Sequence, residues 1–421
     1  MAGSSPVDVA VPGDAAAAER MAAAGRGDAV AFSVLCESYA PMLLGVALRV
    51  LGDRTAAERA VYTVLLEAWR SSRHFDPRSF SVRVWWTIGV RTAALRALPQ
   101  HRATRMAAMH DTQITTLDDR AEAADLGPLR QAVQAAMLDL DDDPRSALQL
   151  AYFEGLGAAE IADRSHIDAD TVRAQVTDGL RRFAAALAGA APPDAPLGPP
   201  ARLAAGYLLG ELTSDDAARF DLGEPVGELP TADVAALRDA VHGIALYTFP
   251  ASPMPHVRAR LLAAITGPER LSPFEGDLAA HLAIRRSEAG DLLTRVDAPH
   301  GWRDDAAGLR LLPLETGVEE HAPETMSSAP GDLDVTMVQR PAWPRDCLVR
   351  AAPGATIPSR YPHSEARVLV LQGGLRQGER RSGPGDTVYW RPGTSLGAAE
   401  PGGAELIVAI SAAVARRPSR R

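Results

Sequence analysis

Residues 152–183, YFEGLGAAEIADRSHIDADTVRAQVTDGLRRF, decide the fold class of the first half of the chain. Gly155 permits a sharp exit from a preceding helix, because glycine adopts backbone conformations that other residues avoid. Ala159, Ile161 and Ala162 then predict a short helix with a small, apolar face. These proportions are typical of a helix-turn-helix.

The second helix of this pattern begins near Asp170, and Asp168 is suited to cap its N-terminus. Val172, Val176 and Leu180 recur at helical spacing and predict the face that packs on the core. The same spacing exposes side chains that could reach base edges or phosphates in a major groove. These candidate DNA-contacting residues are Thr171, Arg173, Ala174, Gln175, Arg181 and Arg182. On spacing alone, an ordinary three-helix packing unit with a solvated face remains the alternative.

Three earlier segments also show helical periodicity. They cover residues 28–50, 56–69 and 80–98, and turn residues at 52–53 and 75–77 separate them. The third segment carries a pair of tryptophans beside a row of arginines. The first half of the chain is therefore expected to be all-α.

The stretch 152–183 is similar to region 4 of sigma factors, and residues 27–53, 56–70 and 75–98 resemble region 2 of the same family. This half of the chain thus resembles an extracytoplasmic-function (ECF) sigma factor of the sigma-70 type. In that family region 2 binds the RNA polymerase core and melts promoter DNA, and region 4 binds an upstream promoter element. The polymerase supplies the chemistry, so the resemblance implies no enzymatic activity here.

The resemblance also assigns roles to side chains of region 2. The polymerase-binding residues would be Glu58, Arg59 and Tyr62, although the family usually has an acidic residue and a glutamine in the last two places. Further DNA-binding residues on the melting helix would be Arg83, Arg91 and Arg96. Because of such departures, a sigma-like scaffold that no longer engages RNA polymerase is the alternative interpretation.

Proline-rich residues 189–200 predict a stiff linker to the second half. Residues 201–265 resemble the helical domain of anti-sigma factors, but Gly223, Gly227 and Pro230 stand where many such domains bind zinc. Short β-branched runs from residue 308 onward, among them 367–371 and 405–410, predict an all-β domain. Its turns resemble those of a ChrR-like cupin barrel of the anti-sigma type.

Metal-binding cupins carry histidines and a glutamate at places where this chain has Arg360, Pro362 and Ala366. His363 and Glu365 lie close by, but two ligands do not define a site. We therefore expect no metal and no cofactor in either domain. A cupin enzyme with a helical regulatory arm is the weakest of the alternatives, because no convergent set of catalytic side chains is present.

The expected organisation follows from these boundaries. It comprises a disordered N-terminus (1–18), a sigma region 2-like domain (19–106), a linker (107–127), a region 4-like helix-turn-helix (128–188), a proline-rich linker (189–200), an anti-sigma-like helical domain (201–290), a cupin-like barrel (291–413) and a basic tail (414–421).

Bulk properties agree with a multidomain regulator. The chain has 421 residues, a formal net charge of −9, only two cysteines and arginine as its only strongly basic residue type. Cys36 and Cys347 lie in apolar stretches without a second cysteine at disulfide or metal spacing, so we expect buried thiols in the cytoplasm. No stretch suggests a signal peptide or a membrane span. The expected partners are RNA polymerase core and promoter DNA, with a contact between the two halves of the chain and no membrane.

Overall fold

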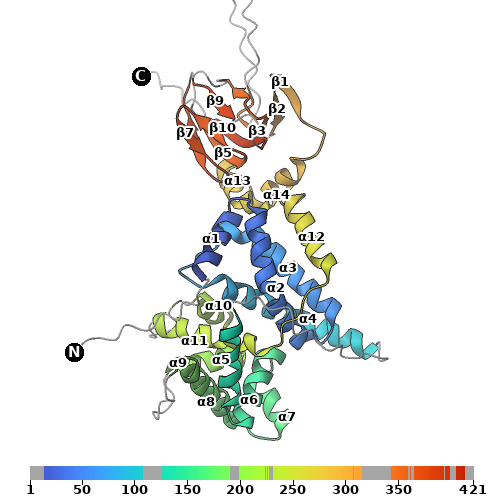
Figure 1. Ribbon diagram of the computed structural model, residues 1–421, viewed down its shortest axis with the longest axis vertical. Helices are drawn as coiled ribbons and strands as arrows, with labels where there is room; N and C mark the ends of the chain where they lie inside the picture. Colours follow the sequence, from blue (N-terminus) through green and yellow to red (C-terminus); the bar gives the residue numbers. More distant parts are fainter. Residues whose placement is uncertain are drawn as a thin grey trace, which may run out of the picture. The chain divides into compact units, whose positions relative to one another are not determined.

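The computed structural model describes residues 14–107, 126–189, 199–222, 224, 226, 231–306, 308–314, 343–358, 361, 365–392, 394–398 and 404–412. The chain divides into two compact units (Figure 1). The helical unit comprises residues 1–24 and 28–266, and the β unit comprises residues 25–27 and 267–421.

The helical unit contains three groups of helices, which follow one another along the chain. The first group is α1 (Asp14–Ala24), α2 (Ala29–Leu51), α3 (Arg54–Ser71) and α4 (Val82–Ala107). The second is α5 (Gly127–Leu138), α6 (Asp142–Gln149), α7 (Ala158–Ser165) and α8 (Ala169–Leu187). The third is α9 (Pro199–Leu208), α10 (Ser214–Leu222), α11 (Thr231–Gly243) and α12 (Pro255–Thr266). Short helical turns lie at Ser72–His74, Leu150–Glu154 and Ile244–Tyr247.

Aromatic side chains join the first group into one core. Phe32 of α2 meets Trp69 of α3 and Trp86 of α4 edge-to-face, with ring centroids 5.3 and 5.5 Å apart. Such geometry adds to the stabilisation from buried area. Helix α2 is long and apolar enough to cross a membrane by composition, yet 56% of its most apolar window is buried among its neighbours. It is the central helix of this core.

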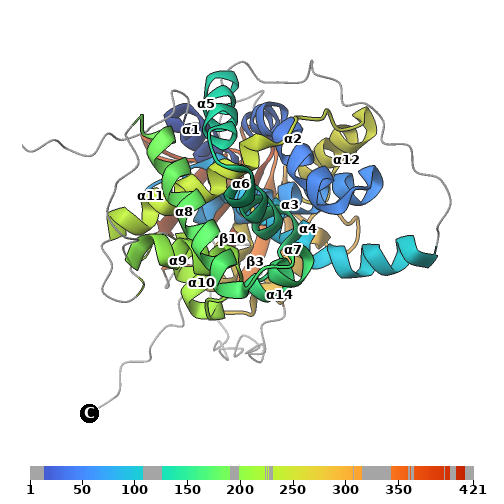
Figure 2. The ribbon, with the colours of Figure 1, turned by 90° about the horizontal axis from the view of Figure 1, so that it is seen from below.

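The second and third groups pack on each other through α8. This helix contacts α5, α6 and α7 of its own group and also α9 and α11 of the third group (Figure 2). A single buried cluster extends through all three groups of the helical unit. The third group is therefore not a separate core within this unit.

The β unit combines two antiparallel sheets with two helices. The larger sheet has the order β1-β2-β3-β10-β5-β8, and the smaller has the order β4-β9-β6-β7. The strands are β1 (Arg303–Ala306), β2 (Leu309–Pro313), β3 (Asp346–Ala351), β4 (Thr356–Ile357), β5 (Ala366–Gln372), β6 (Leu375–Gln377), β7 (Arg380–Ser382), β8 (Thr387–Trp390), β9 (Leu396–Ala398) and β10 (Leu406–Ala412). The helices are α13 (Glu275–Leu282) and α14 (Arg286–Arg295).

The central strands of the larger sheet are buried on both faces. Val349 and Val408 point into the core between the sheets, whereas Leu348, Leu369 and Ile407 pack under α13 and α14. This arrangement explains the unbroken apolar run of β5, since a strand covered on one face only would alternate with polar residues. The predicted strands at 367–371 and 405–410 are confirmed as β5 and β10.

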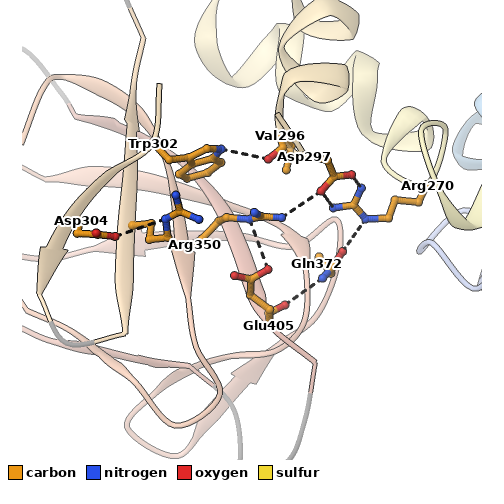
Figure 3. A network of polar contacts seen from close by, with 9 residues as sticks. Arg270, Val296, Asp297, Trp302, Asp304, Arg350, Gln372 and Glu405 are labelled. Atoms are coloured by element: carbon orange, nitrogen blue, oxygen red, sulfur yellow. Dashed lines mark hydrogen bonds and ion pairs between the residues drawn. The ribbon is translucent and has the colours of Figure 1, made fainter. Parts of the chain in front are cut away.

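A polar network fixes the segments around α14 to the larger sheet (Figure 3). Asp297 accepts from Arg270 Nη2 at 2.8 Å and from Arg350 Nη2 at 3.0 Å. Arg350 also lies over the ring of Trp302, 5.2 Å from its centroid, and 3.4 Å from a carboxylate oxygen of Glu405. The network thus connects the helical segment to β3 and to the residue preceding β10.

Two expected boundaries differ from the observed units. The sequence placed residues up to 290 with the anti-sigma-like helices, but residues from 267 belong to the β unit, because Leu278 and Leu293 share a core with the outward face of the sheet. Residues 14–18, expected to be disordered, are helical, and Ala17 is buried in the core of the helical unit. Residues 1–13 lie outside the described residues.

Candidate functional site

Helices α7 and α8 form the helix-turn-helix. Glu160 accepts from the N–H of Gly157 at 2.9 Å and so caps the start of α7. His166 ends α7 in the left-handed conformation, with φ of 58°. Asp168 then accepts from the N–H of Thr171 at 2.8 Å, which confirms it as the cap of α8. The hydroxyl of Thr171 also donates to the Asp168 carboxylate, and this bond, followed by the bond from the Thr171 N–H, lowers the pKa of the carboxyl.

The two faces of α8 are distinct. Val172, Val176 and Leu180 are completely buried, which confirms the predicted core face. Of the candidate DNA-contacting residues, Thr171, Arg173 and Ala174 are exposed, whereas Gln175 is half-buried. Helix α8 thus presents its N-terminal half to solvent in the way that a recognition helix would.

Each arginine of α8 already has a carboxylate partner. Arg173 Nε lies 2.8 Å from Glu211 Oε1, and its Nη1 lies 2.5 Å from Asp170. Arg181 pairs with Asp178 at 2.5 Å, and Arg182 pairs with Asp178 at 2.7 Å and with Asp141 at 3.2 Å. The hydrogen bond that Arg173 donates to Glu211, followed by the negative charge of Glu211, raises the pKa of Arg173. These arginine charges, which would attract DNA phosphates, are therefore compensated by carboxylates of the helical unit.

Glu211 belongs to a different group of helices from the other three carboxylates. Asp141, Asp170 and Asp178 belong to the same group of helices as α8, whereas Glu211 lies in the turn between α9 and α10. The sequence analysis missed this residue, because nothing local marks it as a partner of the helix-turn-helix. The ion pair connects the candidate recognition helix to the third group.

Helix α12 covers part of α3. The guanidinium of Arg260 lies over the ring of Tyr62, 4.7 Å from its centroid. Glu58 is buried and accepts from Arg54 Nε at 3.0 Å and from the main-chain N–H of Met254 at 3.1 Å. Arg59 remains exposed. Two of the three candidate polymerase-binding residues are thus engaged by residues 254–260.

The arginines of α4 differ in exposure. Arg96 is exposed, but Arg83 and Arg91 are buried at 7% and 8% exposure. Arg91 Nε donates to the main-chain carbonyl of Tyr152 at 2.9 Å, and the guanidinium lies 4.6 Å from the centroid of the same ring. In this structure Arg83 and Arg91 are buried and therefore not presented to DNA, and Arg91 is covered by the turn that contains Tyr152.

A buried polar cluster continues from Arg91 into the third group. Tyr207 lies 5.9 Å from the Arg91 guanidinium, measured to its ring centroid, and donates to Asp221 Oδ1 at 2.7 Å. The same Asp221 oxygen lies 3.6 Å from His242 Nε2. His242 is completely buried, and that burial lowers the pKa of its imidazole. Burial likewise raises the pKa of Tyr152 to about 12.

Both cysteines are free and buried, as predicted, and burial raises the pKa of the Cys347 thiol to about 12. Among the described residues no group of three or more potential metal ligands occurs. Of the cupin positions, Ala366 is buried in β5 and Glu365 is exposed. Two further sets of expected positions lie outside the described residues: Gly223, Gly227 and Pro230 in the helical unit, and Arg360, Pro362 and His363 in the β unit.

These features define a helix-turn-helix whose second helix, α8, has its arginines paired with carboxylates. Comparison with known families then gives the kind of protein. Residues 35–104 match the family described as Sigma-70 region 2, and residues 130–183 match Sigma-70, region 4. The first half of the chain therefore carries the two sigma-70 domains in their expected order.

Curated relatives are ECF sigma factors. The ECF RNA polymerase sigma factor SigK of Mycobacterium sp. (strain JLS) is 29% identical over 157 residues, which cover 37% of this chain and 81% of the relative. SigK of Mycolicibacterium vanbaalenii is 28% identical over 160 residues, which cover 37% of this chain and 80% of the relative.

Two solved structures resemble parts of the chain weakly. Rhodobacter sphaeroides SigE in complex with the anti-sigma ChrR aligns with 49% of this chain and 94% of that chain, at 20% identity and a TM-score of 0.21. KdgF from Halomonas sp. aligns with 28% of this chain and 91% of that chain, at 20% identity and a TM-score of 0.17. These TM-scores are too low to support an inference about function.

Proposed function

We propose that this protein is an ECF-type sigma factor that directs RNA polymerase to promoters and is held inactive by the third group of its own helices. The observation that carries the proposal is that residues 211–260 engage both functional surfaces. Glu211 pairs with Arg173 on the candidate recognition helix, and Arg260 covers Tyr62 on the candidate polymerase-binding helix. Each contact occupies a side chain that the active protein would need for binding DNA or RNA polymerase.

Covalent connection favours such control. A tethered inhibitor acts at an effective concentration of about millimolar, so that weak contacts suffice to keep the surfaces covered. The exposed Arg173–Glu211 pair is of this weak, salt-screened kind. At this ion pair, a DNA phosphate can therefore compete with Glu211 for Arg173 at little energetic cost. This function also places the protein in the cytoplasm, with its partners.

The test is run-off transcription with core RNA polymerase on promoter fragments, comparing residues 1–190 with the full chain. We expect activity from the fragment and at least fivefold less from the full chain. A full-length Arg260→Ala, Glu211→Gln double variant should recover activity toward that of the fragment. Equal activity of fragment and full chain would reject inhibition by the second half.

One observation favours a second candidate function, a sigma-like scaffold that no longer initiates transcription. Arg83 and Arg91, which DNA melting would require, are both buried. This candidate predicts that neither the fragment nor the full chain binds core polymerase in a pull-down. Binding by the fragment would exclude it.

A further inference from the structure

Residues 246–254, here called the strap, leave the helical turn Ile244–Tyr247 and cross the first group of helices as an extended segment from Thr248 onward. Its sequence includes Phe249-Pro-Ala-Ser-Pro-Met254, and Pro255 follows as the first residue of α12. Prolines at every second or third position prevent a helix and keep the chain extended, since proline lacks an N–H and disfavours helical geometry in the residue before it. The side chains of Phe249 and Met254 are 59% and 46% exposed, so the strap does not attach mainly through them.

Main-chain groups of the strap make the contacts instead. The N–H of Ala251 donates to the carbonyl of Pro41 at 3.0 Å, and the N–H of Met254 donates to Glu58 at 3.1 Å. The strap carbonyls accept from arginines: Ser252 from Arg54 at 2.6 Å, and Leu246 from Arg130 at 3.1 Å, with Thr248 also bound to Arg130.

The residues that contact the strap come from three helices. Pro41 and Gly45 lie one turn apart on α2, as do Arg54 and Glu58 on α3, so each pair shares one face of its helix. Arg130 lies on α5, in the second group. Arg130 is buried at 5% exposure, and its guanidinium supplies charge-assisted donors to two strap carbonyls. The strap thereby connects region 2 with region 4.

Gly45 determines whether the strap can approach. A Cβ atom at this position would lie 2.3 Å from the carbonyl oxygen of Phe249 and 3.1 Å from its carbonyl carbon. Both atoms are main chain, so a side-chain rotation cannot relieve the clash. Within α2 itself, however, glycine is a poor helix former, and alanine would stabilise the helix. The glycine is thus unfavourable for α2 and required for strap contact.

We propose that an extended polypeptide segment docks on a site formed by Pro41, Gly45, Arg54, Glu58 and Arg130. The strap of the same chain occupies this site, and the absence of a side chain at Gly45 allows it to bind. Recognition through main-chain groups explains why the exposed strap side chains are dispensable for docking. The docking site is inferred from the contacts of the strap alone. Only its effect on transcription depends on the proposed function.

The deciding variant is Gly45→Ala in the full chain, with Gly127→Ala as the matched control, because a Cβ at Gly127 meets nothing within 4 Å. Hydrogen exchange is measured at the amides of Ala251 and Met254. We expect their protection to fall at least tenfold in Gly45→Ala, while the amides of α2 stay as protected as in the wild type or become more so. Unchanged protection at both strap amides would overturn the proposal.

A second variant guards against a general fold defect. Arg54 is 44% exposed and donates to Ser252, so Arg54→Gln should release the strap with little effect on the core. It should lower strap protection in the same direction as Gly45→Ala. If only Gly45→Ala acts and α2 also loses protection, the effect is a folding defect and the docking site is rejected.

Two further readouts separate the outcomes. Sedimentation of the wild type shows whether the occupant is the same chain, since a strap exchanged between copies would give a concentration-dependent dimer and overturn occupation in cis. Run-off transcription is then compared between Gly45→Ala and Gly127→Ala. A released strap with unchanged transcription would leave the docking site intact and reject its inhibitory effect.

Discussion

The Nε atom of Arg91 donates to the main-chain carbonyl of Tyr152 at 2.9 Å, and the guanidinium lies over the ring of the same tyrosine. This one side chain joins α4 of the region 2 domain to the turn that precedes the helix-turn-helix. It also lies near the ring of Tyr207 in the third group. Arg91 thus contacts all three groups of the helical unit.

We expect Arg91→Lys to loosen this junction although the charge is kept. A lysine ammonium lacks the planar fork that bonds a carbonyl while stacking on a ring. The free energy of unfolding of the helical unit should fall by about 1.5–3 kcal/mol, the range for a lost hydrogen bond to a charged group. Urea denaturation followed by circular dichroism at 222 nm measures it. Arg96→Lys, at an exposed position of the same helix, should change stability by less than about 0.5 kcal/mol.

Neutralising Glu211 should make Arg173 more available to a DNA phosphate, with Asp170 as its remaining carboxylate partner. In the full chain, Glu211→Gln should tighten binding to a duplex DNA fragment and steepen the dependence of log K on log salt by about one, as for one added phosphate contact. Fluorescence anisotropy at several salt concentrations measures both quantities. Glu224→Gln removes the same charge near Arg219, away from α8. If both variants behave alike, net charge is responsible and the specific ion pair is not.

Acid should destabilise the helical unit through His242. Burial lowers the pKa of this imidazole, and the groups around it are Asp221, Tyr207, Arg91 and Arg238. An unfolded histidine titrates near 6.5, so its stability contribution is complete above that pH and is lost as the pH falls toward the folded-state pKa.

The measured quantity is the free energy of unfolding between pH 7.5 and 5, followed at 222 nm. The wild type should lose up to about 1.4 kcal/mol per pH unit from this group below pH 6.5. His242→Gln should show a smaller loss, whereas His74→Gln, at an exposed position, should match the wild type. Parallel curves for wild type and His242→Gln would contradict the assignment.

Local sequence patterns predicted the helix-turn-helix, but they did not predict the contacts that other groups of helices make around it. Val172, Val176 and the cap at Asp168 are specified by spacing within one helix, so periodicity finds them. The burial of Arg91 depends on Tyr152 and Tyr207, which lie far away in the sequence. No local rule distinguishes such an arginine from one that is exposed to DNA.

In the β unit, the sequence also indicated that the outer face of the larger sheet is covered. The run Val368-Leu-Val-Leu371 is apolar on both faces, which indicates that something must cover the outer face of the sheet. The helices that cover this face, α13 and α14, lie just before the β strands in the sequence. That argument would have moved the expected boundary from residue 290 toward 267.

Asp297 is expected to stabilise the β unit through two arginine side chains. Asp297 accepts from Arg270 and Arg350, and so holds the segment after α14 on the sheet (Figure 3). Asp297→Asn removes the charge that both guanidinium groups share. Because the carboxylate is 49% exposed, solvent screens these pairs, and we expect a loss of about 1–2 kcal/mol in the β unit.

Asp304 supplies the matched control in the same network. It pairs with Arg310 at 3.5 Å but is 91% exposed, so Asp304→Asn should cost less than about 0.5 kcal/mol. Hydrogen exchange of β3, β5 and β10 reports the β unit without interference from the helical unit. Faster exchange in Asp297→Asn alone would establish that this carboxylate holds the helices on the sheet. Equal exchange in both variants would mean that apolar packing by Leu278 and Leu293 suffices, and that the ion pairs are incidental.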